Sequence, residues 1–197
     1  MIVKIQKFFW IVNALLLKLR LKKIGFPTYI GPTTFIMGSK NIRVGKRVRI
    51  FPGLRIEVHN EGKIDIKDNI SFGQNCHIIC SDTLLEIGSH TTLSGNVFIT
   101  NIDHDYQEIG KHILDQKYMV KKTTIGENCF IGYGAALQAG TILGKQCIVG
   151  ANSVVRGTFP DYCVIAGVPA KIVKRFNPKS GIWEKTDKFG EIIKNNQ

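Results

Sequence analysis

From Met1 to Ile56 the chain contains no acidic side chain, although it contains twelve Lys and Arg residues there. From Glu57 onward, basic and acidic residues are equal at fifteen each, so the N-terminal part carries the whole formal net charge of +12. A basic chain suggests nucleic acid as a partner. However, no basic stripe with interleaved aromatic residues follows Ile56, so we expect no nucleic-acid binding.

The sequence also lacks a C-x-x-C pair, and its five cysteines are odd in number. Both features disfavour a disulfide framework and a zinc ribbon. We therefore expect a reducing compartment, the cytoplasm.

The N-terminal segment lacks a long apolar run as well, since the longest uncharged run among residues 2–23 is residues 8–17. A membrane-spanning helix needs about 20 apolar residues, and the basic residues that follow the run do not match a secretory signal. Residues 1–23 instead predict an amphipathic basic helix. Its basic stripe consists of Lys4, Lys7, Lys18 and Lys22. Two roles stay open for it: contact with an anionic membrane at the inner face, or a cap that buries its apolar face on protein.

What the sequence has instead is a six-residue repeat. From Ile125 it reads IGENCF, IGYGAA, LQAGTI, LGKQCI, VGANSV and VRGTFP. The first position is always aliphatic and the fifth is small in five of the six units. A period of six fits neither a helix nor a simple strand, so it predicts short strands separated by corners around a narrow core. Cys76, Cys129 and Cys147 occupy fifth positions, which indicates packing and not catalysis.

The same register continues upstream in three sets, which begin at Val44, Ile66 and Ile87. Short insertions at 62–65 and 84–86 separate these sets, and a large insertion covers 105–124. Because three units make one triangular coil, the pattern predicts about five coils and a prism of roughly 24 Å.

This pattern resembles the hexapeptide-repeat acyltransferase family over about residues 30–175, in its sugar and polysaccharide O-acetyltransferase branch. The resemblance implies an all-β, left-handed parallel β-helix and a homotrimer with acyl-CoA sites in the clefts between prisms. We expect a helix at 1–23, a β-helix domain at 24–175 with the loop 105–124 inserted, and a tail at 176–197. The Asn-Pro and Ser-Gly signals near the tail predict a strand, a turn and a second strand.

The inserted loop opens on the run Thr100-Asn-Ile-Asp-His-Asp-Tyr106. A histidine between two carboxylates is suited to accept a proton near neutral pH. The resemblance makes His104 the general base, which deprotonates an acceptor hydroxyl for direct attack on the thioester of acetyl-CoA. The group that orients its ring is left open among Asp103, Asp105 and a backbone carbonyl.

Acceptor contacts follow from the resemblance to galactoside and maltose acetyltransferases. They fall on Asn75 and, with a one-residue gap, on Asp82; Asp103 is a third candidate, and His77 and Asn96 are possible neighbours in the same cleft. For the corner residues the alternative is a hydrogen bond to their own backbone.

Cofactor contacts are also implied by the resemblance. Tyr133 and Ala151 follow Ile-Gly and Val-Gly pairs, and the closing motif AGVPAK offers Lys171 and Lys174 for the CoA phosphates. Relatives often carry Thr-Lys where this chain has Arg156-Gly157, so Arg156 is the candidate for the missing charge.

We therefore predict an acetyl-CoA-dependent O-acetyltransferase that acts on a sugar in cell-envelope polysaccharide biosynthesis, without a metal ion. The close alternatives are N-acetylation of an amino nucleotide sugar and acetylation of an antibiotic. Two further alternatives are a carbonic anhydrase of the same fold, which needs three His ligands, and a non-catalytic scaffold.

Overall fold

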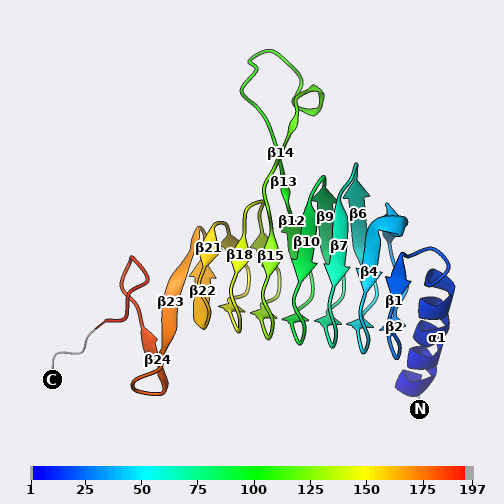
Figure 1. Ribbon diagram of the computed structural model, residues 1–197, viewed down its shortest axis with the longest axis horizontal. Helices are drawn as coiled ribbons and strands as arrows, with labels where there is room; N and C mark the ends of the chain where they lie inside the picture. Colours follow the sequence, from blue (N-terminus) through cyan, green and yellow to red (C-terminus); the bar gives the residue numbers. More distant parts are fainter. Residues whose placement is uncertain (1, 194–197) are drawn as a thin grey trace.

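The computed structural model describes residues 2–193, and residues 2–4 by their backbone alone, so the side chain of Lys4 lies outside the description. Short parallel strands wind into a three-sided prism, with helix α1 (Ile2–Leu17) across one end and a hairpin at the other. A long arm leaves the side of the prism (Figure 1). The predicted β-helix with an N-terminal helix, a protruding loop and a C-terminal tail is confirmed.

Three sheets form the sides of the prism, and each is named after its first strand. The β1 sheet contains β1 (Lys23–Ile24), β4 (Ile42–Val44), β7 (Lys63–Ile66), β10 (Leu84–Ile87), β15 (Thr124–Ile125), β18 (Ile142–Leu143) and β21 (Thr158–Phe159). The β2 sheet contains β2 (Tyr29–Ile30), β5 (Arg49–Ile50), β8 (Ser71–Phe72), β11 (Thr92–Leu93), β16 (Phe130–Ile131), β19 (Ile148–Val149) and β22 (Cys163–Gly167). The β3 sheet contains β3 (Phe35–Met37), β6 (Arg55–His59), β9 (His77–Ser81), β12 (Phe98–Thr100), β17 (Ala136–Leu137) and β20 (Val154–Val155).

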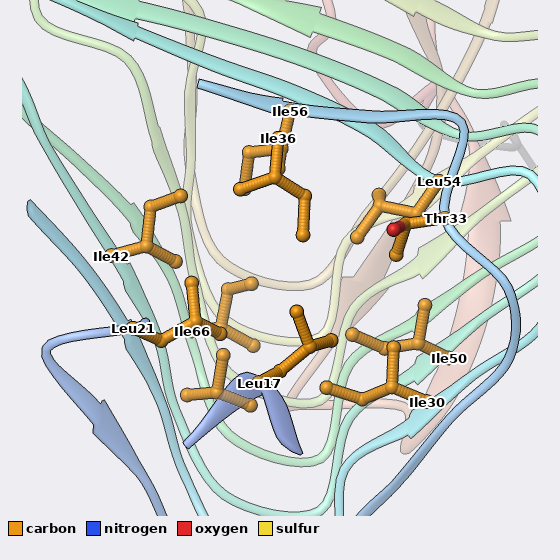
Figure 2. A pocket seen from close by; sticks show the side chains of 11 residues that line it. Leu17, Leu21, Ile30, Thr33, Ile36, Ile42, Ile50, Leu54, Ile56 and Ile66 are labelled. Atoms are coloured by element: carbon orange, nitrogen blue, oxygen red, sulfur yellow. The ribbon is translucent and has the colours of Figure 1, made fainter. Parts of the chain in front are cut away.

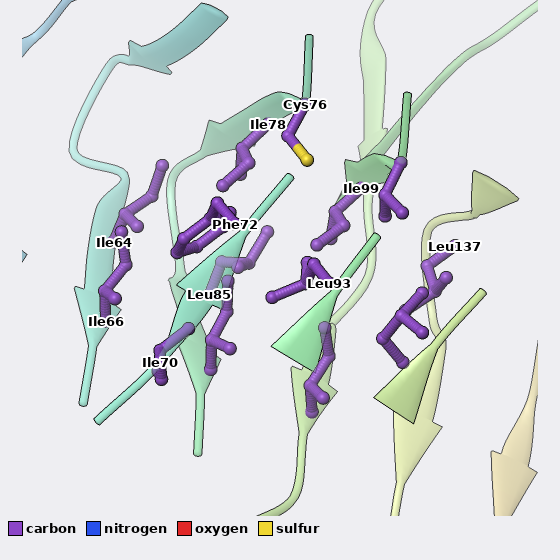
Figure 3. Packing of buried hydrophobic residues seen from close by; sticks show 14 of the residues in the cluster. Ile64, Ile66, Ile70, Phe72, Cys76, Ile78, Leu85, Leu93, Ile99 and Leu137 are labelled. Atoms are coloured by element: carbon purple, nitrogen blue, oxygen red, sulfur yellow. The ribbon is translucent and has the colours of Figure 1, made fainter. Parts of the chain in front are cut away.

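The repeat register explains the core. Equivalent aliphatic positions of successive coils stack directly on one another, as Ile50, Phe72 and Leu93 do in the β2 sheet. Their side chains meet inside the prism, where Phe72 is fully buried (Figure 3). The fifth position is small because it lies at the corner beneath this column. Cys76 is buried there, and its burial raises the pKa of the thiol to about 11, which is the opposite of what a nucleophile needs.

The prediction of five coils was wrong, because the prism has six complete coils and the start of a seventh. The missed first coil is led by Ile24, Ile30 and Ile36, which keep the spacing of six. Gly25 and Gly31 keep the second position in this coil, but Pro27 stands at the fourth position, where later coils have residues such as Asn75 and Asn96, so the corner signal is weak. The partial seventh coil consists of β21 and β22. There Phe159 pairs with Leu143 at a lead position, although the spacing of six counted it as a fifth position.

Helix α1 covers the open end of the first coil. Its Ala14 and Leu17 are buried, and the Nδ2 of Asn13 donates hydrogen bonds to the carbonyls of Ile30 and Gly31 at 3.0 and 3.1 Å. The apolar void left between helix and coil is only about 10 Å³ (Figure 2). Capping of this kind is what an exposed solenoid end requires. No helix in the described part of the chain is long and apolar enough to cross a membrane.

The other end carries the predicted strand, turn and strand. Strand β23 (Ala170–Asn177) pairs antiparallel with β22, and β24 (Ile182–Lys185) pairs antiparallel with β23. This hairpin continues the β2 sheet beyond the last coil (Figure 1).

Candidate active site

The arm leaves the prism where the β3 sheet turns into the β1 sheet, a corner that we call the arm edge. Its stem is an antiparallel pair, β13 (Ile102–His104) and β14 (Tyr118–Val120), and its outer part contains the short 3-10 helix η2 (Ile113–Asp115). His104 lies opposite Tyr118 in this pair, and the two rings make an edge-to-face contact with their centroids 5.0 Å apart. The imidazole is exposed. The predicted base therefore stands on a paired stem beside the prism.

The arm is rooted by Asn101, which is fully buried between β12 and β13. Its Oδ1 accepts the Ser81 N–H at 2.9 Å, and its Nδ2 donates to the Ser81 carbonyl at 2.8 Å. The same Nδ2 lies 2.9 Å from the hydroxyl of Thr83. In an uninterrupted coil, backbone groups of the next coil would bond the N–H and carbonyl of Ser81. Here the arm leaves the prism at that point, and the side-chain amide of Asn101 makes those bonds instead. Nothing in the run from Thr100 to Tyr106 distinguishes this residue by sequence alone.

An ion pair braces the arm on the C-terminal side. Arg156, which follows β20 two coils further on, donates from Nη2 to Asp103 Oδ2 at 2.6 Å and from Nε to Gln138 Oε1 at 3.1 Å. Asp105 accepts the backbone N–H of Gln107. The two carboxylates beside His104 are therefore engaged with other groups, and the contact seen on the His104 ring is Tyr118.

On the N-terminal side lies a polar cluster of which the sequence indicated only His77. The carboxylate of Glu57 is 3.1 Å from His77 Nε2 and 3.5 Å from His59 Nε2, and it accepts a hydrogen bond from Arg55. Burial alone would raise the pKa of Glu57, but the hydrogen bonds from Arg55 and His77 outweigh it and lower that pKa. The ring of His59 lies 6.3 Å from that of Tyr118, so the cluster reaches the arm.

The sequence feature behind this cluster is the alternation of polar and apolar residues along β6. Arg55, Glu57 and His59 occupy every second position, so all three point away from the core. This alternation is ordinary for a strand with one solvated face, so the sequence alone could not separate the cluster from a solvated surface.

Asp82 also lies on the arm edge, at the corner between β9 and β10. Its Oδ2 accepts hydrogen bonds from Ser81 Oγ at 2.7 Å and from Asn60 Nδ2 at 3.3 Å. Both Asn60 and Asp82 adopt positive φ angles of 49° and 57°. Asp82 thus has the left-handed geometry of a corner residue as well as a place near the arm.

The remaining candidates gather on a different corner, between the β2 and β3 sheets, which we call the Tyr133 edge. Asn75, Asn96, Tyr133 and Ala151 lie there in successive coils, and Asn96 Nδ2 donates to the Tyr133 hydroxyl. Lys171 lies opposite Ala166 near the same edge, and Lys174 follows it on β23; both side chains are exposed.

The two edges bound opposite sides of the β3 sheet. Strand β9 has five residues there, which at about 3.3 Å each span about 16 Å. One chain consequently holds His104, Asp82, Asp103 and Arg156 apart from Asn75, Tyr133 and Ala151. A site that uses both groups needs the arm edge of one prism to face the Tyr133 edge of another.

Two other features lie outside this arrangement. A hollow of about 400 Å³ lies near the C-terminal hairpin, at the third corner, and is lined by Gln146, Tyr162, Phe176, Pro178 and Trp183. Among the side chains that the structure describes, no three His, Cys, Asp or Glu residues are grouped to hold a metal ion. The set of ligands that a carbonic anhydrase requires is thus not formed within the described part of one chain.

The ion pair of Arg156 with Asp103 allows a test of whether Arg156 holds the arm or contacts CoA directly. If the residue holds the arm, Arg156→Ala should lower kcat about two- to fivefold, the worth of an exposed ion pair, with KM for acetyl-CoA unchanged. A direct contact with CoA phosphate would instead raise that KM. Steady-state kinetics with Lys174→Ala as the comparison separates the two, and a rise in KM in both variants would contradict the brace.

The sequence of this chain is similar to a known protein family and to several known proteins. The family model described as bacterial transferase hexapeptide (six repeats) matches residues 122–157. A relative provisionally named as the lipopolysaccharide biosynthesis O-acetyl transferase WbbJ of Escherichia coli K12 is 34% identical over 169 residues, which cover 82% of this chain and 83% of the relative. Galactoside O-acetyltransferase of the same strain is 27% identical over 121 residues, 55% of this chain and 58% of that protein.

Among solved structures, a mutant of AntD, an N-acyltransferase from Bacillus cereus in complex with dTDP and coenzyme A, superposes with a TM-score of 0.71. The match covers 84% of this chain and 90% of AntD at 18% identity, so it supports the fold alone. Fold and relatives together define an acyl-transferring enzyme. The chain belongs to the bacterial hexapeptide-repeat transferases and is an acetyltransferase of that family.

Proposed function

We propose that this enzyme transfers an acetyl group from acetyl-CoA to a hydroxyl of a sugar in cell-envelope polysaccharide biosynthesis. The observation that carries the proposal is the exposed His104 on a stem that stands beside the prism. Support for the acceptor class comes from the names of the relatives, one in lipopolysaccharide biosynthesis and one a galactoside O-acetyltransferase.

In the proposed reaction, the imidazole of His104 removes the proton from the acceptor hydroxyl as its oxygen attacks the thioester carbonyl. The new C–O bond forms, the C–S bond of the tetrahedral intermediate breaks, and the departing CoA thiolate takes the proton back from the imidazolium. No acyl-enzyme is needed. Such general-base help is worth about 10²–10⁴ in rate. The ring contact with Tyr118 orients the imidazole of His104. The ion pair of Arg156 with Asp103 holds strand β13, which carries His104.

The proposed assembly is a homotrimer in which each site lies between two prisms. The separation of the arm edge from the Tyr133 edge by the width of the β3 sheet supports this arrangement. In it, one chain supplies His104 and Asp82, and its neighbour supplies Asn75, Tyr133 and Ala151, with Lys171 and Lys174 near the CoA phosphates.

An N-acyl product is the second candidate, because the solved relative AntD is an N-acyltransferase. An amine acceptor would use the same histidine to remove a proton after attack. The Glu57 cluster beside the arm suits either acceptor, since it presents hydrogen-bond donors and acceptors on one surface.

We also propose a cytoplasmic enzyme that works at the inner face of the membrane. Five free, buried cysteines fit a reducing compartment. The concentration of the whole net charge between Met1 and Ile56 fits an anionic surface at one end of the prism.

Mass spectrometry of acetyl transfer tests the proposed reaction. The purified chain is incubated with acetyl-CoA and, separately, with free hexoses, amino nucleotide sugars and lipid-linked oligosaccharides. We expect a mass gain of one acetyl group on an oligosaccharide, at an alkali-labile ester. An alkali-stable product on an amino sugar would favour N-acetylation, and no product on any sugar would overturn the proposal.

A further inference from the structure

Helix α1 has two apolar faces, and the prism covers only one of them. The covered face packs on the first coil through Ala14 and Leu17, with Leu21 in the turn that follows and Asn13 at its border. The other face stays open: Phe8 and Phe9 are 61% and 62% exposed, Leu16 is 62% exposed and Leu19 is 87% exposed. An ordinary capping helix would place polar residues there.

The open apolar residues form one continuous surface. At about 100° per residue, they occupy the side of the helix that lies opposite the covered face. What we call the outer face of α1 consists of Ile5, Phe8, Phe9, Val12, Leu15 and Leu16 on the helix, together with Leu19 in the turn that follows it. Because α1 lies across the end of the prism, its outer face points away from the body of the molecule along the prism axis (Figure 1).

Basic side chains border this outer face. Lys7 lies on α1, and Lys18, Arg20 and Lys22 lie in the segment that directly follows it; all four are exposed. The neighbouring first coils add further cations at the same end, including Lys23 and its strand partner Arg43. No acidic residue occurs before Glu57. An apolar helix face bordered by cations is the arrangement of helices that lie in the interface of anionic bilayers.

We infer that the outer face of α1 inserts into the interfacial layer of an anionic lipid bilayer. The apolar side chains enter the acyl region while the flanking Lys and Arg residues contact lipid phosphates. The charge distribution argues against a second copy of the chain as the partner. If the N-terminal ends of two chains met, the twelve cations of each would repel one another, because neither chain has a carboxylate before Glu57 to pair with them.

The inference rests on the proposed location at the membrane and names the surface that makes the contact; vesicle binding tests it without any acceptor, so its outcome is independent of the test of acetyl transfer. The test variant is the triple Phe9→Ser, Leu16→Ser, Leu19→Ser, whose three side chains do not support the prism. The matched control replaces three exposed apolar residues elsewhere, Ile109→Ser, Leu114→Ser and Val168→Ser, which are 101%, 68% and 70% exposed. Co-sedimentation uses vesicles of phosphatidylcholine mixed with phosphatidylglycerol, and of phosphatidylcholine alone.

The wild-type chain and the control are expected to bind the anionic vesicles, and more weakly as salt rises. The triple variant should lose more than about tenfold in partition, since each buried side chain contributes about that much. Equal binding by the triple variant would overturn the inference. So would a fall in assembly mass of the triple variant in sedimentation velocity without a change in vesicle binding, since it would assign the outer face to a second copy.

A site-specific probe gives an independent measurement. All five native cysteines are buried, so Leu16→Cys is the accessible thiol for a polarity-sensitive dye. Its emission should shift to the blue with anionic vesicles, and the same dye on Ile109→Cys in the arm should not respond. A blue shift at both positions, or at the arm alone, would contradict insertion through α1.

Discussion

Replacement of His104 by alanine should lower kcat by about 10²–10⁴-fold, the usual contribution of a positioned general base. The exposed ring makes a single edge-to-face contact, with Tyr118, so its loss should leave the melting temperature nearly unchanged. KM for acetyl-CoA should also stay the same, because the imidazole acts on the acceptor proton. Steady-state kinetics and thermal unfolding of the same preparation check all three expectations.

The matched control is His59→Ala, which removes a second histidine whose ring centroid lies 6.3 Å from that of Tyr118. It should weaken acceptor binding or arm placement, with a much smaller effect on kcat. If His104→Ala kept wild-type turnover, or if His59→Ala were the more damaged variant, the assignment of the base would be wrong.

Substitution of Asn101 by alanine should destabilise the protein by about 1–3 kcal/mol. It would leave the buried N–H of Ser81 without its partner, while the Ser81 carbonyl would keep only the hydrogen bond from the Thr83 N–H. For a chain of this length that corresponds to a fall of about 2–12 °C in melting temperature. Because Asn101 is also the root of the arm, kcat should fall as well.

The isosteric Asn101→Asp variant tests the mechanism of this loss. An aspartate keeps an oxygen for the Ser81 N–H but has no N–H to donate to the Ser81 carbonyl. It should be at least as destabilising as alanine near neutral pH, because a charge would then be buried. Hydrogen exchange at the amide of Ser81 reports the broken bond directly, and unchanged protection there in Asn101→Ala would contradict the assigned role.

The sequence predicted the fold well because the repeat is enforced residue by residue. Every aliphatic lead position, such as Ile131 or Val149, stacks on its equivalent in the next coil, so local spacing and global structure carry the same information. The first coil escaped detection because its corners are built with prolines such as Pro27, although its aliphatic spacing is intact.

The site was harder to predict because it depends on contacts between coils. Nothing in the spacing of Arg156 and Asp103, 53 positions apart, indicates that they form an ion pair. The cluster around Glu57 likewise brings together neighbouring strands, with His77 one coil away. The separation of the candidate residues between two edges follows from the corner at which each lies, which requires the full coil assignment.

The stacking of coils has a metric consequence. Successive strand layers repeat at about 4.8 Å, and β12, which leads into the arm, is the fourth strand of the β3 sheet. The base of the arm therefore stands about 14 Å along the axis from the first coil, and about 25 Å from the axis of α1 once the thickness of the helix layer is added. If α1 rests on lipid, the number of coils between α1 and the arm fixes the distance of His104 from the membrane surface. An acceptor anchored in the same leaflet must extend over that height, and a chain with one coil more or fewer would select a saccharide of different length.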